Sequence, residues 1–289
     1  MGPTGNKHNG GDKPKNAVPE QNRDKSIFGG LSAFGLGNAE KTRVYGAGET
    51  DGAAESEKAA AMKEIELGIY YKSFNCPVCE TASKVPAVRS SHIRLIKSET
   101  DFMPVYKDPN PLYYFAVFCK YCGFAAIASP LKTPSPAQKK SIREKICAAW
   151  KFDKQYPAYY DPQTAAEVHK LALYNAVVAG EKESVKAIIS LHLGWLYRIM
   201  EDAENETVFL RTAREGFEHI YYNERAPVGN LDKSGQQYLI GELLRRTGDL
   251  HGALDWFKLV LIGREAPQKI KNLARDQKDL IMAHYASDG

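Results

Sequence analysis

Two Cys-x-x-Cys pairs are the residues of this chain whose types and spacing are best suited to chemistry. Cys76 and Cys79 lie in FNCPVC, and Cys119 and Cys122 lie in FCKYCGF, with residues 80–118 between the pairs. Four thiolates are the complete ligand set of a tetrahedral zinc ion. The sequence therefore predicts one structural Zn²⁺ ion bound by these four cysteines.

The residues around each pair are typical of a zinc knuckle, a tight turn that points two sulfurs at one place. Pro77 follows the first cysteine of one pair, and Gly123 follows the second cysteine of the other. Proline and glycine favour such turns, because one fixes φ and the other tolerates unusual φ values. The segment between the pairs is longer than the ~15–20 residues of the commonest spacing, which predicts an extra strand or hairpin there.

Two other uses of the cysteines stay open. A rubredoxin-like iron site has the same four thiolates, so the sequence does not exclude iron. CPVC alone resembles a glutaredoxin-type redox site, but that site needs a helix beginning at its first cysteine. The residues after Cys79 include Pro86 and make a poor helix. A closed four-thiolate site normally holds a small domain together, and the fifth cysteine, Cys147, is interpreted as a core residue.

Polar residues of specific types lie between the two pairs. Arg89, His92, Arg94 and Lys97 are candidates to contact a small anionic ligand or a nucleic-acid phosphate. We expect Arg89, Asp101 and nearby tyrosines to form a charge-assisted network that supports the long insertion. Nothing in the sequence has the order of a Ser/His/Asp triad, a phosphate loop or an open metal site, so we predict that the protein is not an enzyme.

The elements that must position the cysteines are predicted to be strands. Residues 91–99 alternate in part between apolar and charged, which favours a half-exposed strand. Residues 112–119 are rich in aromatic and β-branched types, which favours a strand that ends at Cys119. Three prolines between residues 129 and 136 mark a boundary. Residues 61–130 are therefore predicted to form a β-rich zinc-binding domain.

Residues 131–289 are predicted to form an all-α domain, because apolar residues recur at steps of three and four. Gly180, Gly248 and Gly263 stand where helices are expected to stop. The six predicted helices lie within residues 137–150, 162–180, 184–203, 206–224, 233–249 and 250–263.

Two stretches of the helical half match the tetratricopeptide pattern of small and aromatic residues. The better match contains Gly241, Ala253 and Phe257, and a second contains Gly194 and Phe217 with a longer connection between its helices. The pattern predicts a degenerate tetratricopeptide-like stack of helical hairpins, with an ordinary helical bundle as the alternative. The predicted fold class is therefore α+β, a small β-rich zinc domain followed by a tetratricopeptide-like helical domain.

Charge and hydrophobicity limit the classes of partner and the cellular locations that the sequence allows. The net charge of +4 is too small for a dedicated nucleic-acid binder. No window approaches the ~18 apolar residues of a membrane span, and no signal peptide is present, so a cytoplasmic location is predicted. Residues 1–60 show no sustained periodicity and are predicted to be a disordered tail.

Residues 70–130 resemble a bacterial family catalogued only as domain of unknown function 2225. In that family two Cys-x-x-Cys knuckles flank a set of polar motifs. The acidic motif is Glu-x-Asp here, where the family has Asp-x-Asp. The resemblance implies zinc binding and this architecture but no activity. The matching residues are Arg89-Ser90, Glu99-x-Asp101, Tyr106 and Asn110-Pro111-x-x-Tyr114.

The favoured function at this point is a non-enzymatic zinc-binding adaptor or scaffold. Its helical surface is expected to bind a protein or peptide. One alternative is nucleic-acid binding through the zinc domain, where residues 61–136 carry nine basic and six acidic side chains. A second alternative is thiol redox chemistry at a Cys-x-x-Cys pair. No membrane partner is expected.

Overall fold

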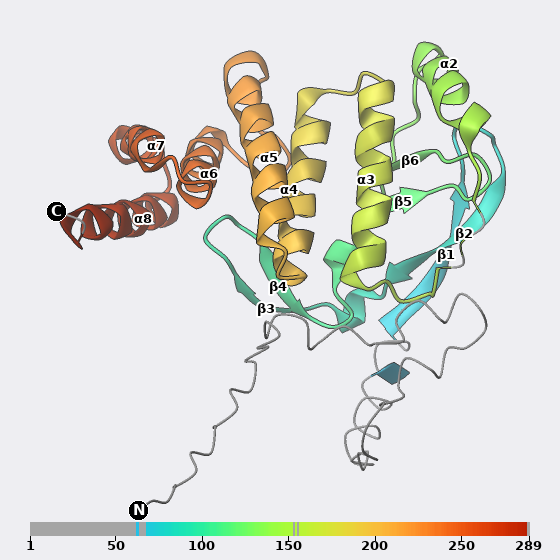
Figure 1. Ribbon diagram of the computed structural model, residues 1–289, viewed down its shortest axis with the longest axis horizontal. Helices are drawn as coiled ribbons and strands as arrows, with labels where there is room; N and C mark the ends of the chain where they lie inside the picture. The colour runs from blue at the N-terminus through green and yellow to red at the C-terminus, as the bar shows by residue number, and fades with distance from the viewer. Residues whose placement is uncertain (1–61, 64–67, 153, 155, 288–289) are drawn as a thin grey trace, which may run out of the picture. The chain divides into compact units, whose positions relative to one another are not determined.

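The computed structural model describes residues 62–63, 68–152, 154 and 156–287, which all belong to one compact unit (Figure 1). The predicted disordered tail, residues 1–60, lies outside these described residues. The helices that the structure describes include none that is both long and apolar enough to cross a membrane.

The strands form three separate antiparallel pairs. The turns of the first and third pairs contain the two Cys-x-x-Cys motifs, and the second pair is the extra hairpin expected between them. Its first strand is exposed at all five residues, whereas the sequence predicted a half-exposed strand. The pairs are β1 (Ile69–Asn75) with β2 (Ala82–Val88), β3 (Arg94–Ser98) with β4 (Pro104–Lys107), and β5 (Ala116–Phe118) with β6 (Ala125–Ile127).

The strand predicted over residues 112–119 is only partly correct. Pro111–Tyr114 forms a 3-10 helix, η5, and the strand β5 begins at Ala116. The side chain of Asn110 caps η5 by accepting a hydrogen bond from the backbone N–H of Leu112. Asparagine before proline is a strong helix start. This local cap outweighs the strand preference of the aromatic residues.

Helices are the main elements in the rest of the described chain. All six predicted helices are present, and the final helix, α8, follows them. Gly180 and Gly248 take positive φ values, 60° and 95°, just beyond the ends of two helices, as their placement predicted. The helices are α2 (Pro136–Lys145), α3 (Pro162–Val178), α4 (Glu183–Ile199), α5 (Ala203–Asn223), α6 (Lys233–Arg246), α7 (Leu250–Ile262) and α8 (Gln268–Ser287), with short 3-10 helices η4 (Ser90–His92) and η6 (Cys147–Ala149).

The α+β class is confirmed, and α4 with α5 and α6 with α7 pack as neighbouring helix pairs. Small residues allow this close packing. A Cβ atom on Gly194 would lie 2.5 Å from Leu210 of the paired helix, and one on Gly241 would lie 2.7 Å from Phe257. The glycines singled out in the sequence are thus the points of closest approach. Whether the stack is a true tetratricopeptide array stays a prediction.

Two hydrophobic clusters form the core. The smaller one surrounds the cysteines and includes Phe74, Val78 and Phe124 together with Ile142 of α2. The larger one fills the helical region and also contains residues from the strand region, such as Leu112. The domain boundary between residues 130 and 131 stays a prediction.

Candidate metal centre

The four cysteine sulfurs lie together, all within 4.8 Å of one another. The Sγ atoms of Cys76 and Cys122 are 3.6 Å apart, as are those of Cys79 and Cys119. A tetrahedral zinc ion with Zn–S bonds of ~2.3 Å places its sulfurs ~3.8 Å apart. Disulfide sulfurs would be at ~2.05 Å. The donor set and its spacing therefore fit one metal ion, and each sulfur comes from a buried or half-buried side chain.

The two knuckles have the same backbone design. In each, the first cysteine accepts a backbone hydrogen bond at its carbonyl from the residue four positions on, Glu80 in one and Gly123 in the other, both at 2.9 Å. The repeated turn is what aims the sulfurs at one point.

The residue that directly follows each Cys-x-x-Cys pair has the same conformation in both knuckles, which predicts a stabilising substitution. Both Glu80 and Gly123 are left-handed, with φ of 61° and 74°. Only glycine adopts this conformation without steric strain. We expect Glu80→Gly to raise the free energy of unfolding by about 0.5–1 kcal/mol in chemical denaturation.

The opposite change in the second knuckle is the matched control. A Cβ atom on Gly123 would lie 2.5 Å from the ring of Trp150. Gly123→Ala is therefore expected to destabilise the protein through both strain and this clash. A loss of stability in Glu80→Gly would contradict the equivalence of the two turns.

A helical segment covers both knuckles. Arg143 of α2 donates to the carbonyl of Val78 at 2.7 Å, and the indole N–H of Trp150 donates to the carbonyl of Lys120 at 2.8 Å. Cys147 packs against the cysteine cluster, within hydrogen-bonding reach of Cys122, but is not among the four converging sulfurs. The knuckles are thus held from outside as well as by their ligand sulfurs.

The four predicted anion contacts are placed on the surface or half-buried. Arg89 lies over the ring of Tyr70, 5.4 Å from its centroid. Lys97 forms an ion pair with Glu99 at 2.8 Å. Arg94 is exposed on β3 and His92 is half-buried in η4. Their role in binding an anion stays a prediction.

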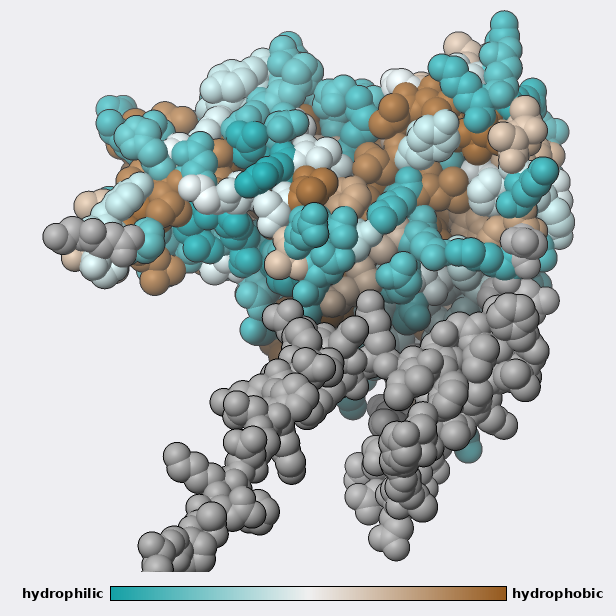
Figure 2. All heavy atoms as spheres, in the orientation of Figure 1, coloured by the Kyte–Doolittle hydropathy of each residue, from teal (hydrophilic) through white to brown (hydrophobic). Residues whose placement is uncertain are grey.

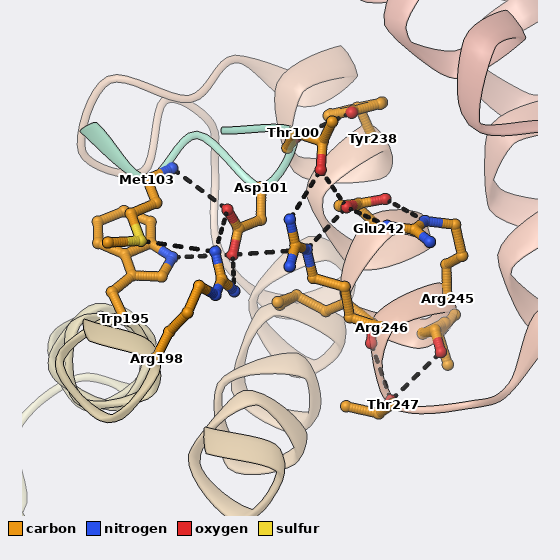
Figure 3. Close-up of polar contacts among 12 residues, drawn as sticks. Thr100, Asp101, Met103, Trp195, Arg198, Tyr238, Glu242, Arg245, Arg246 and Thr247 are labelled. Carbon is orange, nitrogen blue, oxygen red and sulfur yellow. Dashed lines mark hydrogen bonds and ion pairs between the residues drawn. The ribbon is translucent and has the colours of Figure 1, made fainter. Parts of the chain in front are cut away.

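Asp101 has different partners from those the sequence suggested. It was expected to pair with Arg89, but its fully buried carboxylate contacts helices instead (Figure 3). Arg198 of α4 donates to both carboxylate oxygens, at 3.1 and 2.7 Å. The indole N–H of Trp195 donates at 3.0 Å, and Arg246 of α6 lies 3.8 Å away. The charge-assisted network exists, but it joins the tip of the β3–β4 hairpin to α4 and α6.

A second buried carboxylate completes this network. Glu242 of α6 has no exposed surface and pairs with Arg245 and Arg246, each at 2.8 Å. Thr100, next to Asp101, donates its hydroxyl to Glu242 and accepts from Arg246. Tyr238 donates its hydroxyl to the backbone carbonyl of Thr100 at 2.8 Å. Figure 3 shows these side chains converging on the hairpin tip from α4 and α6.

The pairing sets the ionisation of Asp101. Burial by itself would raise the pKa of this carboxyl, but the hydrogen bonds and charge of Arg198, with the charge of Arg246, outweigh burial and lower the pKa. Asp101 is therefore charged in the folded protein. We name the set of Thr100, Asp101, Arg198, Glu242, Arg245 and Arg246 the hairpin clamp.

Sequence reasoning found one member of the hairpin clamp, Asp101, among the polar residues between the two knuckles. It missed Thr100 and the four charged members on α4 and α6, because charged residues in amphipathic helices normally face solvent. Their only distinguishing feature in the sequence is the adjacent pair of arginines near the end of α6.

Comparison with known families matches residues 69–281 to an uncharacterised protein family conserved in bacteria, DUF2225. The match spans both knuckles, the hairpin clamp and nearly all of the described helices. No curated protein and no solved structure shows a significant match to the chain.

Proposed function

The chain belongs to the bacterial DUF2225 family, and we propose that it is a non-enzymatic adaptor with one structural zinc ion. The four converging sulfurs of Cys76, Cys79, Cys119 and Cys122 support this proposal. Four protein ligands fill a tetrahedral coordination shell, whereas a catalytic zinc keeps one position for water or substrate. The metal would then hold the knuckles together, and the chemistry of the protein would be binding.

The partner surface that we propose lies on α7 and α8, the last two helices. Large hydrophobic side chains are exposed there, and Figure 2 shows hydrophobic residues at this C-terminal end of the described chain. In stacked-helix proteins a terminal pair normally presents a polar outer face, and exposed apolar residues mark interaction sites. A protein partner with a complementary apolar surface fits this end of the stack. The exposed residues are Leu259, Ile262, Leu280, Met282 and Tyr285.

A quantitative pull-down tests the adaptor proposal. We expect the double variant Ile262→Asp, Leu280→Asp to lose specific partners that the unchanged chain captures, because each aspartate would be desolvated in an apolar interface. Val208→Asp is the control, since Val208 is exposed at 52%, against 66% for Ile262 and 58% for Leu280, but lies on α5. Capture that is identical for all three proteins, or absent for all three, would contradict the proposal.

A further inference from the structure

A large cleft with a volume of about 900 Å³ runs along α4. The residues of α4 that line it recur every three or four positions, so one face of the helix forms its floor. Lining positions from Lys182 to Trp195 span about 20 Å of helix. The other walls include residues of η5, β6, α3 and the α5–α6 connection. None of the four cysteines lines the cleft.

The body of the cleft is apolar. Leucine, isoleucine, valine and aromatic side chains from several elements line it, as is typical of sites that take a hydrophobic small molecule. Phe115, Ile127 and Ile188 are half-buried in this lining, and Leu112, Leu191, Phe217 and Leu239 are buried behind it.

The charged residues that line the cleft belong to the start of α4 and the segments beside it. Two are carboxylates that already have partners. Glu224 accepts hydrogen bonds from the backbone N–H and the hydroxyl of Ser184, and Glu181 accepts one from Gln138. Both carboxylates are thus engaged by protein donors.

The positively charged side chains near the start of α4 lack such partners among the described residues. Lys132, Lys182 and Arg225 line the cleft, are exposed, and form no ion pair or side-chain hydrogen bond with any residue that the structure describes. By contrast, the opposite end is lined by Phe102, Pro104 and other uncharged residues. The cleft therefore combines a long apolar body with one end at which three cations outnumber two carboxylates.

We propose that this cleft binds an amphipathic anion with a long acyl chain, of which a fatty acid is the simplest. The carboxylate would lie among Lys132, Lys182 and Arg225, and the chain would lie along α4 toward Trp195. A purely apolar ligand would leave the three cations unused. A small polar anion would leave the apolar body filled with water, which is unfavourable.

One polar side chain within the cleft refines the ligand class. The ring of His192 lines the cleft between Phe115 and Trp195, at centroid distances of 3.9 and 4.8 Å. Neither ring nitrogen has a hydrogen-bond partner within the described part of the chain. Burial, and then the nearby His169, hold the pKa of His192 well below its usual value, so the ring is neutral. A hydroxyl or carbonyl group on the acyl chain would find a hydrogen-bond partner here.

Calorimetric titration of the full chain with three probes tests whether binding needs both the acyl chain and the negative charge of the ligand. Palmitate carries both the chain and the charge, hexadecanol carries the chain alone, and butyrate carries the charge with a short chain. We expect palmitate to bind with one site per chain, hexadecanol to bind about tenfold more weakly or worse, and butyrate not to bind. Palmitate affinity should fall as salt is added, because the cations are exposed.

Variants locate the bound ligand. Ile188→Trp fills the middle of the cleft and should abolish palmitate binding. Lys182→Glu with Arg225→Glu, both at exposed positions, should weaken it about tenfold or more without affecting the fold. Lys258→Glu is the control for charge, because Lys258 is exposed on α7 and does not line the cleft.

The charge variants keep the test decisive even if Ile188→Trp fails to fold, which thermal unfolding would reveal. Absence of palmitate binding would overturn the proposal. Palmitate binding that is unchanged in the double charge variant, or hexadecanol binding as tight as that of palmitate, would overturn it as well.

Discussion

Replacing Cys119 by serine is expected to release the bound metal and to unfold the knuckle region. The Cys119 side chain is completely buried, and its sulfur is 3.6 Å from that of Cys79. A serine hydroxyl is a poor ligand for zinc, so only three thiolates would remain. Metal binding to a structural site contributes ~10–16 kcal/mol to folding in zinc-finger peptides. The stability of a whole domain is only ~5–15 kcal/mol.

The structure around the second knuckle has few other interactions that could replace the free energy of metal binding. The second knuckle lies between β5 and β6, which have three residues each and pair only with one another. A single short hairpin is marginal in water. Without the metal, the small core around Phe74, Val78 and Phe124 would lose the bonds that hold its two halves together.

Metal analysis by plasma emission, combined with thermal unfolding, measures both effects. The unchanged chain should hold one metal ion, and Cys119→Ser should hold none and unfold at a much lower temperature. Cys147→Ser is the matched control, because Cys147 lies beside the cluster but is not one of the four sulfurs, and it should keep one ion. A colourless protein containing zinc would also exclude iron. Full metal content in Cys119→Ser would refute the assignment of ligands.

The knuckles could be predicted from the sequence because their signal is local. Two cysteines three positions apart, with Pro77 or Gly123 beside them, define a turn within a few residues of chain. The helices were predictable for a similar reason, since apolar periodicity and terminal glycines act over one or two turns. Local caps also explain the main error, because Asn110 begins a 3-10 helix where aromatic residues suggested a strand.

The hairpin clamp and the cleft could not be predicted, because both depend on how distant segments pack. Asp101 is 97 residues from Arg198, and no spacing rule relates them. Each arginine of the clamp looks like an ordinary solvated residue in its own helix. The cleft is set by the separation of α4 from η5, β6 and the α5–α6 connection. A sequence pattern identifies which face of a helix is apolar but not whether another element covers that face.

Replacing Asp101 by asparagine is expected to lower the free energy of unfolding by ~3–5 kcal/mol near neutral pH. The Asp101 carboxylate is fully buried and accepts hydrogen bonds from Arg198 and Trp195. Asparagine keeps the size of the side chain but removes the charge. Arg198, whose side chain is only 19% exposed, would lose its main partner. Arg198 keeps its ion pair with Glu206 at 2.7 Å, but the two hydrogen bonds that it donates to Asp101 would lose their charged acceptor in a buried site, which is why the effect is large.

Two comparisons separate this effect from general damage to the protein. Glu215→Gln breaks an ion pair whose carboxylate is 68% exposed, and it should change stability by less than ~1 kcal/mol. The double variant Asp101→Leu, Arg198→Met removes both partners of the buried pair. It should be less destabilised than the sum of the two single variants, because neither partner of the Asp101–Arg198 pair is left without the other. The loss of the ion pair between Arg198 and Glu206 is common to the double variant and to Arg198→Met, so it does not affect this comparison. If the loss of stability in the double variant equals the sum of the losses in the two single variants, direct pairing of Asp101 with Arg198 is contradicted.

The effect of Asp101→Asn should also depend on pH. The pKa of Asp101 is lowered in the folded protein, so on acidification the unfolded chain binds a proton at this site first. The stability that Asp101 contributes is therefore complete above the unfolded pKa of ~3.9 and is lost as pH falls through the folded pKa. The difference in unfolding free energy between the unchanged chain and Asp101→Asn should stay constant from about pH 7 to about pH 5 and shrink between about pH 5 and about pH 3. Acid also releases metal from thiolates, but that loss affects both proteins, so the difference between them isolates the carboxylate. A difference that stays constant down to about pH 3 would mean that the charge of Asp101 does not stabilise the fold.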